Sequence, residues 1–242
     1  MTSVLITGAN KGLGHETARR FGELGWKVFL GSRDEGRGRV AAQKLAVDGA
    51  DVVAVPLDVS SEESVASAVR LVREDTDQLD VLINNAATSG GGVNPVDATA
   101  EDIQAVYDTN VYGPVRVTHA FLPLLQAADN PRVVMVTGPG GSIAYVTDPG
   151  QPVSKMFELA YTSSKAALNM ITVRYAQALP ALKFNAAIPG EIANGRFPAT
   201  DMSRHMGELT VTEGSDPIIE LATLAPDGPT GTFRDRLGPI AW

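Results

Sequence analysis

The chain of 242 residues carries a net charge of −8 and contains no cysteine, which excludes disulfides, thiol catalysis and cysteine-ligated metals. Without a lysine- or arginine-rich run, its acidic balance argues against nucleic acids and anionic membranes as partners. No secretory signal and no apolar stretch of membrane-spanning length is visible, so we expect a cytoplasmic protein.

The first predicted strand, Val4–Thr7, is a short apolar run typical of a strand buried on both faces. A glycine-rich turn follows at 8–14, and a helical pattern then runs to Gly25. Glycines let the backbone approach a pyrophosphate, and the N-terminus of a helix supplies N–H groups and the positive end of a dipole. Such a turn can also occur only because a strand and a helix pack tightly. The strand before it and the helix after it favour the interpretation as a dinucleotide-binding turn.

Near the end of the second predicted strand, 27–33, Ser32 stands where an acidic residue often holds the ribose hydroxyls of NAD. Arg33 comes next, with Lys11 in the glycine turn and Arg37 just beyond, and a guanidinium suits a 2′-phosphate. These charges therefore favour NADP(H), although they would also suit a solvated surface. Asp34 leaves NAD(H) open.

Strands and helices continue to alternate along the chain. Further strands are predicted at 51–58, 79–83, 132–137, 183–188 and 230–233. Helices are predicted at 35–47, 99–127, 157–170 and 212–224, and another helix begins at 61. This order without a composition break predicts one α/β domain over residues 1–242, a doubly wound sheet. The segment at about 190–211 has little periodicity, and we expect it to be a substrate lid.

Polar residues mark several of these junctions. Asp58 and Val59 follow the third strand, and Asn84 and Asn85 follow the fourth, at the carboxyl ends where doubly wound sheets bind ligands. Asparagines also form ordinary turns. Asn110 lies inside a predicted helix, where asparagine is unfavourable, and so calls for a special reason.

Tyr161 and Lys165 are four residues apart in a predicted helix and therefore share one face. A fixed ammonium favours the phenolate and lowers the pKa of the phenol, which makes a general acid for a carbonyl oxygen. A tyrosine and a lysine at this spacing also occur by chance on exposed helices. The other motifs therefore decide whether this pair is functional.

Taken in order, these motifs resemble the short-chain dehydrogenases/reductases over nearly the whole chain. The matching motifs are Thr7 to Gly14, Asp58-Val59, Asn84-Asn85-Ala86, Asn110, Tyr161-x-x-x-Lys165 and Pro189-Gly190. The resemblance implies a single Rossmann-type domain with a seven-stranded parallel sheet flanked by helices. It also implies a nicotinamide cofactor, held by Gly8, Asn10, Lys11, Gly12, Leu13, Gly14, Arg33, Asp58, Val59, Asn85, Ala86, Tyr161, Lys165, Pro189 and Gly190.

The resemblance further implies catalytic roles. Tyr161 would protonate the carbonyl oxygen as hydride arrives from the nicotinamide. Lys165 would lower the pKa of that tyrosine and bind the nicotinamide ribose, and Asn110 would hold a water in the proton relay.

One family residue is missing from this set. The serine that orients the substrate carbonyl usually ends the fifth strand, and Gly138 stands in its place. Thr137 and Ser142 are the nearby hydroxyls, and Ser142 is our candidate to replace it. Losing an oxyanion donor typically costs on the order of a hundredfold or more in rate, so the departure matters.

We therefore expect an NADPH-dependent oxidoreductase that reduces a ketone or aldehyde on a small to medium organic molecule. The alternatives are an NADP(H)-binding protein without turnover, which Gly138 would favour, and an isomerase, dehydratase or cyclase on the same scaffold. The three widely spaced histidines predict no metal site. A homo-oligomer stays open.

Overall fold

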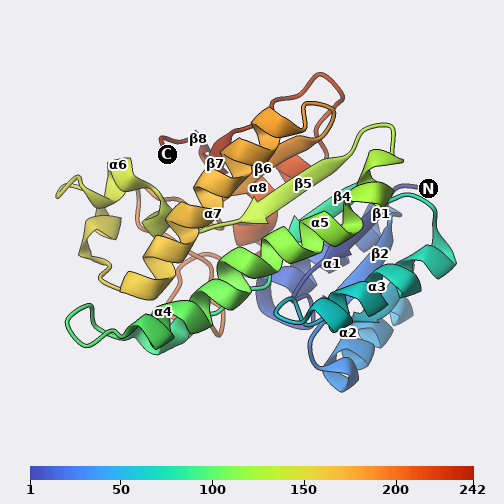
Figure 1. The fold of residues 1–242 in the computed structure, drawn as a ribbon, viewed down its shortest axis with the longest axis horizontal. Helices are drawn as coiled ribbons and strands as arrows, with labels where there is room; N and C mark the ends of the chain where they lie inside the picture. The colour runs from blue at the N-terminus through green and yellow to red at the C-terminus, as the bar shows by residue number, and fades with distance from the viewer.

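The computed structural model describes residues 1–242 and contains one sheet in the order β3-β2-β1-β4-β5-β6-β7-β8 (Figure 1). Seven strands are parallel: β1 (Ser3–Ile6), β2 (Lys27–Ser32), β3 (Val52–Pro56), β4 (Val81–Asn84), β5 (Arg132–Val136), β6 (Lys183–Ala187) and β7 (Phe233–Asp235). The predicted doubly wound Rossmann-type fold is confirmed.

The sheet has one strand more than the seven predicted. The eighth, β8 (Gly238–Pro239), pairs antiparallel with β7. Asp235 Oδ1 accepts hydrogen bonds from the backbone N–H groups of Leu237 and Gly238 at 2.8 and 3.2 Å, and these bonds close the tight turn between the strands.

Helices cover both faces of the sheet (Figure 1). One face carries α1 (Gly12–Glu23), α2 (Glu35–Val47) and α8 (Val211–Ala222), and the other carries α3 (Glu62–Asp75), α5 (Gly113–Gln126) and α7 (Leu159–Ala178). Side chains alternate along each strand, so Leu5 packs under α3 and α5 whereas Val4 and Ile6 pack under α1 and α2. Burial on both faces explains why these strands are apolar throughout.

The helix predicted at 99–127 is interrupted. It consists of α4 (Ala100–Tyr107), a π-helical turn η2 (Asp108–Tyr112) and α5. Asn110 lies in that turn, and π-turns inside helices often mark functional positions. The special reason expected for Asn110 is therefore a local change of helical geometry.

Short helical turns occupy the loops next to the sheet: η1 (Gly90–Gly92), η3 (Pro139–Gly141), α6 (Ile143–Val146) and η4 (Pro152–Lys155). The C-terminus holds the loop after β5. Ala144 N–H donates to Trp242 O at 3.3 Å, and the Trp242 ring stacks on Phe233 with centroids 4.9 Å apart. None of the helices is long and apolar enough to cross a membrane.

Candidate active site

The candidate site lies where β1, β4, β5 and β6, neighbours in the sheet, reach their carboxyl ends. The glycine turn follows β1, Asn85 follows β4, and Gly138 follows β5. Pro189 and Gly190 follow β6. Because parallel strands end at one edge, motifs far apart in the sequence meet here.

The glycine turn has the conformation that its residues predict. Gly8 and Gly12 have φ values of 65° and 56°, which favour glycine. A Cβ on Gly14 would come within 2.6 Å of Asn85 Nδ2, so a side chain there would break the junction with β4. A Cβ on Gly12 would meet only Thr200 at 3.9 Å, which leaves the start of α1 open on that side.

The N-terminus of α1 is suited to an anion. No acidic residue lies in its first turn and no side chain caps it, whereas Asp34 caps α2 and Ser61 caps α3. The free N–H groups and the helix dipole are the elements that bind a pyrophosphate. The site therefore fits the diphosphate of a dinucleotide.

Beside this terminus lies an open groove of about 470 Å³, within the range of ligand pockets. Its lining includes Lys11, Arg37 and Lys44 and no carboxylate. Arg33 is exposed nearby, and Asp34, which had kept NAD(H) open, accepts the Arg37 N–H at 2.9 Å as the cap of α2. The surroundings thus fit a 2′-phosphate.

Asp58 lies within the electrostatic reach of Arg33. Burial raises the pKa of this carboxyl, but hydrogen bonds from Ser60 and the charges of Arg33 and Arg116 outweigh it, so the pKa falls below its ordinary value. Asp58 thus stays ionised at neutral pH. The side chain of Val59 is buried against Gly113, which leaves its backbone for any ligand contact.

Lys11 also has a partner that the sequence did not suggest. Its Nζ lies 2.5 Å from Asp201 Oδ2, and Asp201 Oδ1 lies 3.0 Å from His205 Nε2. Asp201 belongs to the segment at 190–211, which is thereby attached to the glycine turn. Arg204 and His205 are the only non-glycine residues with positive φ, 52° and 57°.

Asn85 and Ala86 join the end of β4 to the glycine turn. Asn85 Nδ2 donates to Thr7 O and Gly8 O at 2.8 and 3.1 Å, and Ala86 N–H donates to Thr7 Oγ1 at 2.9 Å. Leu13 packs against the core beneath α1. These residues hold the shape of the turn from below, and Asn10 lines the groove beside it.

Tyr161 and Lys165 lie side by side on α7, as their spacing predicts, with Lys165 Nζ 5.5 Å from the centre of the Tyr161 ring. Lys165 is 2% exposed and donates to Val136 O at 3.0 Å. Burial lowers the pKa of Lys165 to about 8. Burial and the charge of Glu158 raise the pKa of Tyr161 to about 12, opposite to the expected shift. Desolvation is the larger cause, and the phenol is protonated at neutral pH.

Gly138 faces the Tyr161 hydroxyl, as the sequence register indicates. A Cβ on Gly138 would lie 2.9 Å from that oxygen. Ser142 does not take the missing serine's place, because its Oγ donates to Ala241 O at 2.8 Å and accepts the Tyr145 N–H at the start of α6. Thr137 Oγ1 points to Lys165 O at 3.4 Å. Neither hydroxyl is directed at Tyr161.

Asn110 is buried and makes three hydrogen bonds through its side chain. Its Nδ2 donates to Thr88 O at 2.9 Å and Ser164 Oγ at 3.0 Å, and its Oδ1 accepts the Thr88 N–H at 2.8 Å. The side chain thus ties the loop after β4 to the helix that bears Tyr161. Both amide hydrogens of Asn110 are therefore in use, and Oδ1 already accepts one hydrogen bond.

Tyr161 also lines a small pocket between α7 and the loop at 88–93. Its other polar side chains are Ser89, Asp102 and Glu158, and its apolar ones are Val93, Ala98 and Ala160. The motif search missed Glu158, and it missed Thr200 above Gly12. Glu158, the N-cap of α7, precedes Tyr161 by three residues, which was the available clue.

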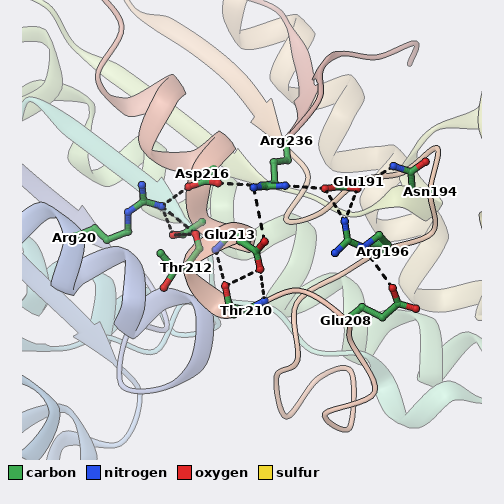
Figure 2. A network of polar contacts seen from close by, with 11 residues as sticks. Arg20, Glu191, Asn194, Arg196, Glu208, Thr210, Thr212, Glu213, Asp216 and Arg236 are labelled. Atoms are coloured by element: carbon green, nitrogen blue, oxygen red, sulfur yellow. Dashed lines mark hydrogen bonds and ion pairs between the residues drawn. The ribbon is translucent and has the colours of Figure 1, made fainter.

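Pro189 and Gly190 begin a loop held by a dense set of ion pairs (Figure 2). Gly190 has φ 138°, and a Cβ there would lie 2.4 Å from Arg196 O. The next residue, Glu191, is 3% exposed and pairs with Arg196 and Arg236 at 3.2 and 2.9 Å. Arg236 in turn binds Asp216 of α8 at 3.1 Å. The start of the predicted lid is therefore anchored to the sheet and to α8.

The sequence profile of the short chain dehydrogenase family matches residues 2–203. Among curated proteins, a short-chain dehydrogenase/reductase of Stachybotrys chlorohalonatus, ATR10, is 35% identical, covering 97% of this chain and 88% of its own. The (-)-isopiperitenone reductase of Mentha piperita is 30% identical, covering 96% and 95%. The chain belongs to the short-chain dehydrogenase/reductase family and is an oxidoreductase of that class.

Solved structures agree with this assignment. Salutaridine reductase from Papaver somniferum superposes with a TM-score of 0.83 and 26% identity, over 96% of this chain and 99% of that one. An NADPH-bound carbonyl reductase from chicken fatty liver gives a TM-score of 0.82 and 28% identity, over 100% and 99%.

Proposed function

We propose that this protein is an NADPH-dependent carbonyl reductase that acts on a ketone or aldehyde of a small to medium organic molecule. The arrangement of Tyr161 and Lys165 beside Gly138, at the carboxyl end of β5, carries the proposal. Two similar proteins, the reductases from mint and chicken liver, support this substrate class.

NADPH fits the residues that surround the glycine turn. Gly8, Gly12 and the uncapped start of α1 would hold the diphosphate, and Lys11, Arg33 and Arg37 would hold the 2′-phosphate. When bound, the nicotinamide supplies the hydride that a carbonyl carbon needs. The chain has no carboxylate in the groove to repel that phosphate.

Tyr161 supplies the proton. Because its pKa is about 12, the hydroxyl holds its proton at neutral pH and can give it to a carbonyl oxygen as negative charge develops there. Lys165 remains mostly protonated at pH 7, since its pKa is about 8, and its charge stabilises the phenolate left behind. The protonated phenol favours reduction over oxidation.

The proposed site has fewer hydroxyl donors than the family pattern implies. Gly138 offers no side chain, so the oxyanion depends on Tyr161 alone among the side chains described at this position. Asn110 and Ser164 support Tyr161 from behind by fixing α7 against the loop after β4.

NADPH consumption across a panel of ketones and aldehydes tests the proposal. We expect Tyr161→Phe to lower kcat by about 10²- to 10⁴-fold with unchanged NADPH binding. Tyr175→Phe makes the same change on α7, where the ring stacks on Phe184 instead of facing the site, and should behave as wild type. Retained turnover in Tyr161→Phe would remove this residue from the mechanism. Tight NADPH binding without turnover of any carbonyl would favour an NADP(H)-binding protein without redox turnover.

A further inference from the structure

Glu158 is a carboxylate without a structural purpose of its own. Its Oε2 is buried and has no hydrogen-bond partner. It stands at the N-cap of α7, yet it makes no capping hydrogen bond, unlike Thr99 on α4 and Thr210 on α8. A buried charged oxygen is costly unless it is paired, so an unpaired one that lines a pocket calls for a partner.

The position of Glu158 connects it to the reaction centre. It lines the same pocket as Tyr161, which follows three residues later. Glu158 is the N-cap and has extended backbone, so the shared pocket is what shows that the two side chains are neighbours. A group bound by Glu158 would therefore lie only a few bonds from a carbonyl bound by Tyr161.

The rest of the pocket determines which group fits. No lysine or arginine lines it. The second carboxylate, Asp102, is already used, because its Oδ2 accepts the Thr99 N–H at 2.9 Å and the Thr99 hydroxyl at 2.8 Å. Val93, Ala98 and Ala160 supply apolar wall. The pocket thus offers one free negative charge among apolar neighbours, which suits a cation with a hydrocarbon frame.

Resting on the carbonyl reductase proposed above, we infer that Glu158 selects carbonyl substrates that carry a protonated amine a few bonds from the carbonyl. The carboxylate pairs with the ammonium and places the carbonyl at the Tyr161 hydroxyl. A bound cation would also offset the charge of Glu158, one of the two influences that hold the pKa of Tyr161 high, and so would ease proton donation.

A matched pair of ketones tests this selectivity. In 4-(dimethylamino)butan-2-one an ammonium stands where 5-methylhexan-2-one has a neutral carbon of the same shape. We expect kcat/KM of the wild type at pH 7 to be about 10- to 100-fold higher for the amino ketone, as a charge-assisted hydrogen bond provides. Glu158→Gln should bring the ratio close to one, mainly through the KM of the amino ketone, and Glu158→Asp should restore part of it.

Glu74→Gln is the control, because Glu74 is exposed on α3 and away from the pocket, and it should keep the wild-type ratio. A wild-type ratio near one, or a ratio that Glu158→Gln leaves unchanged, would overturn the inference. Thermal unfolding of each variant verifies that it is folded.

A binding measurement separates this inference from the proposed activity. N,N-dimethylbutylamine has the ammonium but no carbonyl, so calorimetry on the NADPH-loaded protein reports binding without turnover. Weakening by about tenfold or more in Glu158→Gln would support the cation site even if no ketone were reduced. No binding, or equal binding to both proteins, would overturn it.

Discussion

A Cβ built on Gly138 would lie 2.9 Å from the hydroxyl oxygen of Tyr161. The space that a serine side chain would fill is thus taken by the phenol itself. Gly138 has φ −160° and ψ 163°, an extended conformation that any residue adopts. The backbone would therefore accept a serine, and only the Tyr161 side chain would have to move.

This relationship predicts the effect of side chains at position 138. Gly138→Ala should lower kcat by about tenfold, because its methyl displaces the phenol without adding a donor. Gly138→Ser causes a similar displacement but adds an oxyanion donor, and such a donor is worth about 10²- to 10³-fold. We expect the serine variant to exceed the alanine variant in kcat by at least about tenfold. Equal kcat values for the serine and alanine variants would show that a hydroxyl at position 138 does not stabilise the oxyanion.

The pH dependence follows from the buried lysine. Since the pKa of Lys165 is lowered to about 8, its positive charge is lost as the pH rises through that value. The kcat/KM for NADPH, which reports the free protein, should fall above pH 8. No second fall is expected near pH 10, because the pKa of Tyr161 is about 12. A profile that stays flat to pH 10 would contradict the assignment to Lys165.

Cofactor preference should depend on the arginines of the groove. Arg37→Ala removes a guanidinium from the groove lining and should raise the KM for NADPH about 10- to 100-fold while leaving that for NADH unchanged. Arg33→Ala should act in the same direction. Arg39→Ala is the matched control on α2, since Arg39 pairs with Glu35 outside the groove lining. An equal rise in the KM for NADPH and for NADH would contradict a 2′-phosphate site.

The pairing of Lys11 with Asp201 predicts a gain of affinity. Asp201→Asn removes the carboxylate that competes with phosphate for Lys11, and the pair is more than half exposed, so we expect only a two- to fivefold lower Kd for NADPH, roughly. Glu208→Gln removes a charge from the same segment without touching Lys11 and should change nothing. A higher Kd for NADPH in Asp201→Asn would mean that Asp201 positions Lys11 for the cofactor.

Ser142 should contribute to stability and not to turnover. Ser142→Ala removes the hydrogen bond to Ala241 O and the cap of α6, so the free energy of unfolding should fall by about 1–2 kcal/mol in urea titrations. The kcat for a ketone should change less than twofold, roughly. A fall of about a hundredfold in kcat with unchanged stability would restore Ser142 as the replacement hydroxyl.

Local patterns in the sequence were sufficient to predict the architecture and the location of the candidate site. Short apolar runs predicted β1 to β6, the glycines predicted the turn after β1, and four-residue spacing placed Tyr161 beside Lys165. These features depend on neighbours within a turn or a strand, so the chain itself determines them. The closing parallel strand was predicted at 230–233, but β7 lies at Phe233–Asp235, and the two-residue β8 was missed because so short a strand carries no periodicity.

Burial and partner choice were decided by tertiary structure alone. Ser142 is bound by Ala241, ninety-nine residues away, and Lys11 by Asp201, a hundred and ninety residues away. The raised pKa of Tyr161 and the unpaired oxygen of Glu158 arise from the sum of all packed neighbours, which no short motif specifies. Sequence therefore placed Tyr161 beside Lys165, whereas the fold determined that the phenol stays protonated, faces a glycine and lies beside a free carboxylate.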